Sequence, residues 1–208
     1  MAQLESRSLH IPGAWELFPA IYDDARGIFL ETFSAPRLAE AIGVEFRVAQ
    51  SNLSVSREGA LRGLHFADVP PGQAKLVTAV RGTAFDVIVD IRTGSPTYGD
   101  VASVVLDAEK RNSVYLAEGL AHGFLALEPD TAVSYLVSES YNPGAEHGID
   151  PFDASLGIDW PAMALDGSVL DYELSEKDRG APGLEQMAAE GRLPSWEESK
   201  KYLPERSG

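Results

Sequence analysis

Residues 84–91 read Ala84-Phe85-Asp86-Val87-Ile88-Val89-Asp90-Ile91, a short alternating run that is rich in β-branched side chains. Such a run is typical of a strand in a packed sheet. Similar runs occur at residues 76–80, 101–106, 113–116 and 132–137, and the turn signals between them include Pro70-Pro71-Gly72, Arg81-Gly82, Gly94-Ser95-Pro96 and Glu118-Gly119. Many short strands between closely spaced turns predict an all-β fold, an antiparallel sandwich or barrel.

Helix signals are few. Residues 34–42 predict a short helix, with Ser34 as the N-cap, Pro36 in the first turn and Gly43 just past the end. Helix-forming residues also occur at 184–190 and 194–203, on either side of Gly191. Neither a β–helix–β alternation nor a glycine-rich dinucleotide loop is present, which argues against a Rossmann fold. We expect one domain over residues 1–208, with a β core at about 10–180 and a helical tail at about 181–208.

The composition restricts the function. Seventeen Lys and Arg against 32 Asp and Glu give a net charge of −15, which argues against nucleic-acid binding, since that needs a broad basic surface. A nucleotide ligand remains compatible, because a few local cations suffice for a diphosphate. The absence of cysteine excludes disulfides, thiolate metal sites and cysteine nucleophiles. With no apolar signal core and no run long enough to cross a membrane, we expect a cytoplasmic protein with no membrane contact.

Chemistry-bearing residues gather in two segments. The first is Leu61-Arg62-Gly63-Leu64-His65, with Lys75 ten residues later, and the second is Glu118-Gly119-Leu120-Ala121-His122-Gly123-Phe124. A single histidine in a strand is often a satisfied structural residue. Two of the four histidines in glycine-flanked strands, with Arg62 and Lys75 nearby, instead favour a functional site.

A metal site is the first alternative for these histidines. The usual metal-binding β-barrel needs two histidines one residue apart, a following carboxylate and a later third histidine. Here Phe66 and Ala67 follow His65, so only His65 and His122 match, and Lys75 adds positive charge. We therefore expect no metal and no other cofactor.

The chain resembles the dTDP-4-dehydrorhamnose 3,5-epimerase family over residues 26–194. The resemblance rests on the order and spacing of several segments: residues 24–31 (DARGIFLE), 50–52 (QSN), 61–65 (LRGLH), Lys75, 86–92 (DVIVDIR), 119–124 (GLAHGF), 141–143 (YNP) and 174–178 (LSEKD). It implies a cupin-type jelly roll of antiparallel strands with short flanking helices. It also implies a homodimer. The implied substrate is dTDP-4-keto-6-deoxy-D-glucose, and the implied reaction inverts C3 and C5 of the sugar without a cofactor.

The resemblance assigns roles to thirteen positions. His65 is implied as the base and Asp178 as its partner, Lys75 as the group that stabilises the enolate, and Tyr135 as the acid on the opposite face. The implied substrate-binding residues are Arg26, Glu31, Gln50, Asn52, Arg62, His122, Tyr141, Glu146 and Lys177. Among these, Arg62 suits the diphosphate, Tyr141 suits the thymine ring, and Arg26 and Glu31 suit the partner subunit's site.

Each catalytic assignment has a structural alternative. Asp178 would otherwise be a solvated loop acid in residues 175–179, Lys75 a surface lysine, and Tyr135 a core aromatic of a strand. Arg26 and Glu146 could be ordinary surface charges.

The chain also departs from the family pattern. Residues 149–153 (IDPFD) replace an aromatic-Asn-Asp segment, and Ala67-Asp68 stand where many relatives have glutamine. These departures leave open which keto sugar is preferred and whether both C3 and C5 are inverted. The alternatives are an epimerase of a specialised deoxysugar pathway that inverts C3 alone, a non-catalytic nucleotide-sugar binder and a metal-dependent cupin enzyme.

Overall fold

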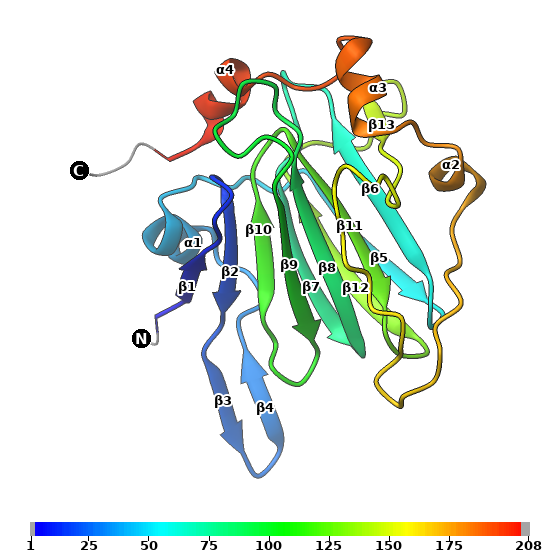
Figure 1. The fold of residues 1–208 in the computed structure, drawn as a ribbon. Helices are drawn as coiled ribbons and strands as arrows, with labels where there is room; N and C mark the ends of the chain where they lie inside the picture. Colours follow the sequence, from blue (N-terminus) through cyan, green and yellow to red (C-terminus); the bar gives the residue numbers. More distant parts are fainter. Residues whose placement is uncertain (1–2, 205–208) are drawn as a thin grey trace.

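The computed structural model describes residues 3–204, which form two antiparallel β-sheets facing one another (Figure 1). The six-stranded sheet has the spatial order β1 (Glu5–Ser8), β2 (Ala14–Phe18), β10 (Ser113–Leu116), β7 (Lys75–Arg81), β12 (Thr131–Val137) and β5 (Gln50–Ser56). The five-stranded sheet has the order β13 (Glu146–Gly148), β6 (Leu61–Ala67), β11 (Leu120–Ala126), β8 (Thr83–Asp90) and β9 (Val101–Asp107). The predicted all-β jelly-roll class is confirmed.

The side chains between the sheets form the central core. Strand β8 contributes Ala84 and Ile88 to it, while its alternate residues Val87 and Val89 pack on the outer face of the five-stranded sheet. This alternation is the period of two of a pleated strand. Because Asp86 has the same parity as Ala84 and Ile88, its carboxylate also points between the sheets.

Short helices cover the outer faces. Helix α1 (Ala35–Ile42) places Leu38 and Ile42 against the six-stranded sheet, where they pack with Leu17 and Tyr115. It begins after Ser34 and ends at Gly43, whose φ of 73° is the left-handed conformation that favours glycine, so the predicted helix is confirmed. The Ser34 side chain makes no capping hydrogen bond.

The remaining helices lie after the sheets: α2 (Glu176–Arg179), α3 (Leu184–Ala189), α4 (Trp196–Ser199) and the 3-10 turn η1 (Lys200–Tyr202). Leu184 and Met187 of α3 pack on the outer face of the five-stranded sheet. The reading of residues 175–179 as a solvated loop is wrong, because they form α2 and its N-cap and bury Asp178 to 5% exposure. No helix within residues 3–204 is long and apolar enough to cross a bilayer.

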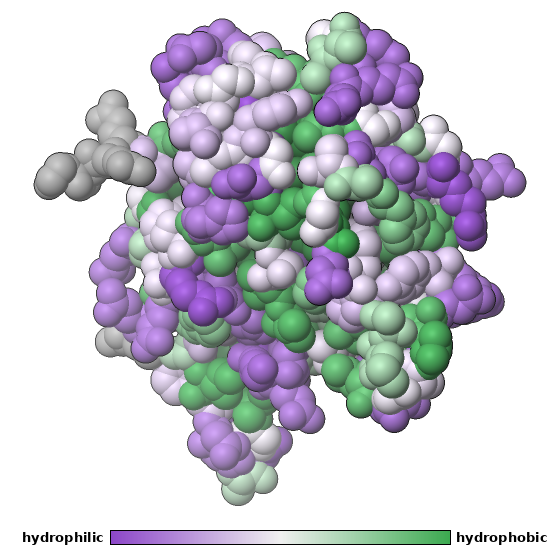
Figure 2. Space-filling model, viewed as in Figure 1, coloured by the Kyte–Doolittle hydropathy of each residue, from purple (hydrophilic) through white to green (hydrophobic). Residues whose placement is uncertain are grey.

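A hairpin of β3 (Ile21–Asp24) and β4 (Gly27–Leu30) projects from the sheets, at the bottom of Figure 1. It exposes Ile21, Tyr22, Ile28 and Phe29, the last at 67%. Figure 2, in the same view, shows apolar side chains at the surface of this projection. An exposed apolar hairpin of this kind is typical of a segment that packs against another chain.

Candidate active site

A cavity of about 540 Å³ lies between the two sheets. Eleven of the thirteen residues assigned from the sequence line it: Gln50, Asn52, Arg62, His65, Lys75, His122, Tyr135, Tyr141, Glu146, Lys177 and Asp178. They come from both sheets, from the segment after β12 and from α2. The structure thus brings together residues that lie as far apart in the chain as Gln50 and Asp178.

Strand register explains why these side chains converge. His65 of β6 lies directly opposite His122 of β11, so both rings project from one place on the five-stranded sheet. On the facing sheet, Tyr135 of β12 lies opposite Asn52 of β5, and Lys75 of β7 lies opposite Val137, two residues along from Tyr135. Because alternate residues share a face, Lys75 and Tyr135 both point into the cavity.

His65 is paired with a buried carboxylate. Its Nε2 lies 2.6 Å from Oδ1 of Asp178, and the Ser175 hydroxyl accepts the Asp178 backbone N–H at 3.1 Å. Burial alone would raise the pKa of Asp178, but hydrogen bonding to His65, the His65 charge and the Ser175 contact together lower it. The carboxylate is therefore ionised and accepts the Nε2 proton of His65. That tautomer leaves Nδ1 as the basic nitrogen of the ring.

His122 forms a second pair of the same type that sequence reasoning missed. Its Nε2 lies 2.7 Å from Oδ2 of Asp86, a residue that is 1% exposed. Burial raises the pKa of Asp86, although the charges of His122 and Lys75 act to lower it. The available signal was an aspartate at an inward position of an apolar strand, where a charge needs a partner.

Lys75 and Tyr135 are the two titratable side chains that the six-stranded sheet, as described, contributes to this cavity. Lys75 is 9% exposed, and burial lowers its pKa while the charges of Glu146 and Asp86 favour the ammonium. Burial raises the pKa of Tyr135, with Arg62 opposing and Glu146 reinforcing the shift, so the phenol keeps its proton at neutral pH. The surface-lysine alternative for Lys75 is wrong.

The polar rim is organised by hydrogen bonds. The Gln50 amide donates to Asn52 Oδ1 at 2.7 Å and accepts the Tyr141 backbone N–H at 3.0 Å. Arg62 donates through Nε to the hydroxyl of buried Ser56 at 3.0 Å, and among residues 3–204 its two terminal guanidinium nitrogens have no partner, which leaves them for a ligand. Four further lining residues were not singled out from the sequence: Ser54, Gln73, Phe124 and Ser175.

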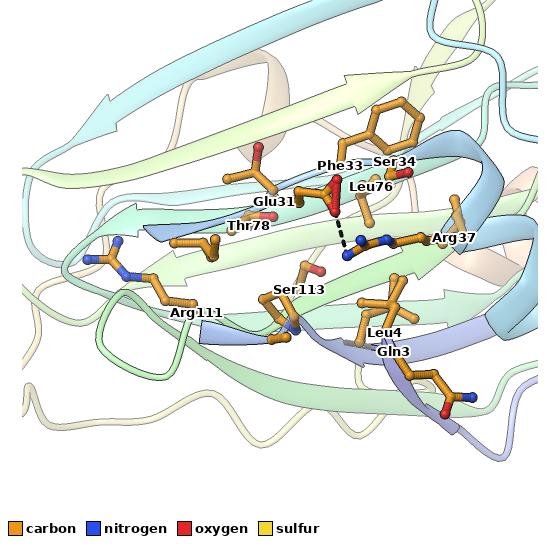
Figure 3. A pocket seen from close by; sticks show the side chains of 16 residues that line it. Gln3, Leu4, Glu31, Phe33, Ser34, Arg37, Leu76, Thr78, Arg111 and Ser113 are labelled. Carbon is orange, nitrogen blue, oxygen red and sulfur yellow. Dashed lines mark ion pairs between the residues drawn. The ribbon is translucent and has the colours of Figure 1, made fainter. Parts of the chain in front are cut away.

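Arg26 and Glu31 lie outside this cavity. Arg26 is on the projecting hairpin and pairs with Asp24 at 2.6 Å, with 90% of its side chain exposed. Glu31 pairs with Arg37 at 2.5 Å beside a separate cavity under the hairpin and α1, where the two side chains point toward one another (Figure 3). Within one chain these two residues do not contribute to the central site.

Within residues 3–204, no three His, Asp or Glu side chains converge in the manner of a metal site. His65 and His122 each direct Nε2 at a carboxylate. The groups present in the cavity can abstract a proton, donate a proton from another wall and stabilise an oxyanion.

Comparison with known proteins identifies relatives over nearly the whole chain. The family model described as dTDP-4-dehydrorhamnose 3,5-epimerase matches residues 8–186. A dTDP-4-dehydrorhamnose 3,5-epimerase of Mycobacterium tuberculosis is 47% identical over 205 residues, covering 99% of this chain and 100% of the relative. A dTDP-4-dehydrorhamnose 3-epimerase of Streptomyces niveus is 49% identical over 190 residues, covering 91% and 88%.

A solved structure of an epimerase from Mycobacterium tuberculosis has the same architecture. It superposes with a TM-score of 0.90 at 48% identity, covering 95% of this chain and 97% of that one.

Proposed function

The chain belongs to the dTDP-4-dehydrorhamnose 3,5-epimerase family of isomerases, and on that premise we propose that it converts dTDP-4-keto-6-deoxy-D-glucose to dTDP-4-keto-L-rhamnose. The reaction inverts C3 and C5, the two carbons that flank the C4 ketone, and uses neither a metal nor a cofactor. The observation that carries the proposal is the pairing of His65 with Asp178 in one cavity with Lys75 and Tyr135.

Proton removal is assigned to His65. Nδ1 takes the proton from the carbon beside the ketone, and the electron pair of the broken C–H bond moves onto the C4 oxygen. Asp178, ionised and hydrogen-bonded to Nε2, stabilises the imidazolium that results. The buried ammonium of Lys75 stabilises the enolate oxygen, where charge develops in the transition state.

Inversion requires the new proton to arrive from the other face. His65 projects from the five-stranded sheet and Tyr135 from the six-stranded sheet, which supports a transfer of the phenolic proton to the carbon from the wall opposite the base. The tyrosinate and the imidazolium then exchange protons with water before the second carbon reacts.

The remaining cavity residues are proposed to bind the substrate. Arg62 takes the diphosphate through its free terminal nitrogens, and exposed Tyr141 stacks on the thymine ring. The other sugar- and nucleotide-binding groups are Gln50, Asn52, His122, Glu146 and Lys177.

A homodimer accounts for the position of the hairpin. Its apolar surface and its distance from the chain's own cavity support a placement against a second copy, where Arg26 and Glu31 reach the partner's nucleotide. We propose that residues 1–208 act as one domain in such a dimer, in the cytoplasm.

The test is hydrogen exchange in D2O. With dTDP-4-keto-6-deoxy-D-glucose, NMR should show loss of both the C3 and the C5 proton signals, and His65→Ala should abolish both losses while dTDP still binds. Loss at C3 alone would reassign the chain to the reaction named for the Streptomyces niveus relative. An absence of exchange with intact dTDP binding would leave a nucleotide-sugar binder.

A further inference from the structure

Two residues of strand β6 enter the catalytic cavity although they lie three positions apart in the chain. Arg62 and His65 both line the cavity. Leu61 and Leu64, the residues just before each of them, pack instead in the core on the outer face of the five-stranded sheet. In a regular strand, side chains an odd number of positions apart point to opposite faces. Strand β6 therefore departs from regular pairing between Arg62 and His65.

The departure is a β-bulge at Gly63. Arg62 lies opposite Phe124 of β11. Three positions further along β6, His65 lies opposite His122, which is only two positions from Phe124, so β6 contains one extra residue. Gly63 has a φ of 111°, and a Cβ there would lie 2.6 Å from the His122 carbonyl oxygen, so the bulge requires glycine. The extra residue turns Arg62 and His65 toward the same wall of the cavity.

A residue of the facing sheet holds the Arg62 side chain. Arg62 is exposed, and the hydrogen bond from its Nε to the Ser56 hydroxyl, at 3.0 Å, is its one side-chain hydrogen bond within residues 3–204. Ser56 is the last residue of β5, at the edge of the six-stranded sheet. It is 2% exposed and does not line the cavity. The acceptor that fixes Arg62 is therefore a buried hydroxyl that the ligand does not reach.

A hydrogen bond at Nε fixes the plane of the guanidinium. The two terminal nitrogens then form a planar fork toward the cavity, which matches a pair of diphosphate oxygens. An arginine without such a contact would lose rotamer freedom on binding the ligand, and this loss of entropy would weaken the affinity. The Ser56 hydroxyl orders Arg62 before the ligand arrives.

We propose that Ser56 is a positioning residue for the diphosphate: it orients the Arg62 guanidinium without touching the substrate. The inference rests on the proposed function, because it takes the ligand of Arg62 to be the diphosphate of a dTDP-sugar. The bulge at Gly63 extends its consequence. Since Arg62 and His65 project from one short stretch of β6, a fixed guanidinium also fixes where the diphosphate lies relative to the base.

The test compares dTDP with thymidine, which has the same base and deoxyribose but no phosphate. Ser56→Ala should weaken dTDP binding about 3–10-fold, measured by calorimetry, the effect of one long side chain that becomes ordered only on binding. Thymidine binding, measured by NMR titration, should be the same in the variant and the parent. Ser103→Ala, at an exposed serine of β9 outside the cavity, is the matched control and should bind both ligands as the parent does.

A double-mutant cycle tests whether Ser56 acts through Arg62. Once Arg62→Ala has removed the guanidinium, adding Ser56→Ala should weaken dTDP binding no further. A serine that only stabilised the fold would lower the affinity by the same factor in both backgrounds. If Ser56→Ala does not fold, Ser56→Cys carries the same comparison, because a thiol is close in shape to the hydroxyl and is a weak hydrogen-bond acceptor.

Three results would overturn the inference alone: equal affinity of the parent and the Ser56 variant for dTDP, an equal loss of affinity for thymidine, or a further loss in the Arg62→Ala background. A parent protein that does not bind dTDP at all would instead contradict the proposed function, and with it the diphosphate as the ligand of Arg62.

Discussion

A histidine can serve as the base in this cavity only if one ring nitrogen is unprotonated and directed at the substrate. The 2.6 Å contact between Nε2 of His65 and Asp178 meets the first part of this condition, because it holds the proton on Nε2 and leaves Nδ1 unprotonated. Asp178 is itself buried, and its backbone N–H donates to the Ser175 hydroxyl, so packing and a hydrogen bond both hold the carboxylate in place. We therefore expect the dependence of catalysis on Asp178 to be electrostatic and orientational, acting through His65.

Asp178→Asn should lower kcat by about 10²–10⁴-fold, because an amide neither stabilises the imidazolium nor enforces the tautomer. Binding of dTDP, measured by calorimetry, should be unchanged. Asp171→Asn, at an exposed aspartate on the preceding segment, is the control and should retain full kcat. Normal turnover in Asp178→Asn would contradict the pairing as the source of the base.

Tyr135→Phe separates proton loss from inversion. The variant keeps His65 and Lys75, so the C3 and C5 protons should still exchange with D2O at a measurable rate. Without the phenol, protonation from the six-stranded sheet is lost, and NMR should show deuterium incorporated with retained configuration. Inverted product at the parent rate would refute Tyr135 as the acid.

At the scale of single elements, the strands were the most predictable part of the fold. Residues 84–91 and 113–116 alternate strongly and became β8 and β10 with nearly the predicted bounds. Helix α2 was not predicted, because four residues carry too little periodicity for a helix signal. Its N-cap sequence, Ser175 three residues before Asp178, was the only local sign.

The cavity needed more than local patterns. The contact between His65 and Asp178 spans 113 positions, and nothing in composition or spacing indicates it. Family resemblance supplied eleven residues that the structure brings to one place, yet it did not supply Asp86 or Ser56. Asp86 and Ser56 contact site residues but do not line the cavity themselves. An aspartate or a serine in a strand does not indicate such a contact until the strand register is known.

The cap of α2 gives a test at this scale. Ser175→Ala should cost about 1 kcal/mol of the free energy of unfolding, because the first turn loses its acceptor. It should also lower kcat, since Asp178 is then less well fixed toward His65. Ser195 caps α4 in the same way: its hydroxyl accepts the Glu198 backbone N–H at a distance of 3.2 Å. Ser195 does not line the catalytic cavity.

Ser195→Ala is therefore the matched control: it should lose similar stability, measured by urea unfolding, and keep its kcat. Ser175→Thr, which retains a hydroxyl cap, should recover activity. If both alanine variants keep full kcat, the cap of α2 has no part in positioning Asp178.

At the scale of the whole molecule, Glu118 should shape the dependence of stability on pH. Its pKa is about 7 in the folded protein and about 4.5 when exposed. Between these values the folded state binds more protons than the unfolded state, so this group makes the free energy of unfolding fall as the pH rises from 4.5 to 7. The penalty persists above pH 7 and amounts to roughly 3 kcal/mol.

Glu118→Gln removes that titration. Urea unfolding should show a variant that gains stability relative to the parent as the pH increases from 5 to 8, with the difference levelling off above 7. The net charge of −15 also destabilises the protein at high pH, but that contribution affects both proteins nearly alike. Glu109→Gln controls for the loss of one charge, because its exposed carboxylate should leave the stability difference nearly constant across this range. Parallel curves for the parent and Glu118→Gln would mean that the Glu118 carboxyl is solvated in the folded protein.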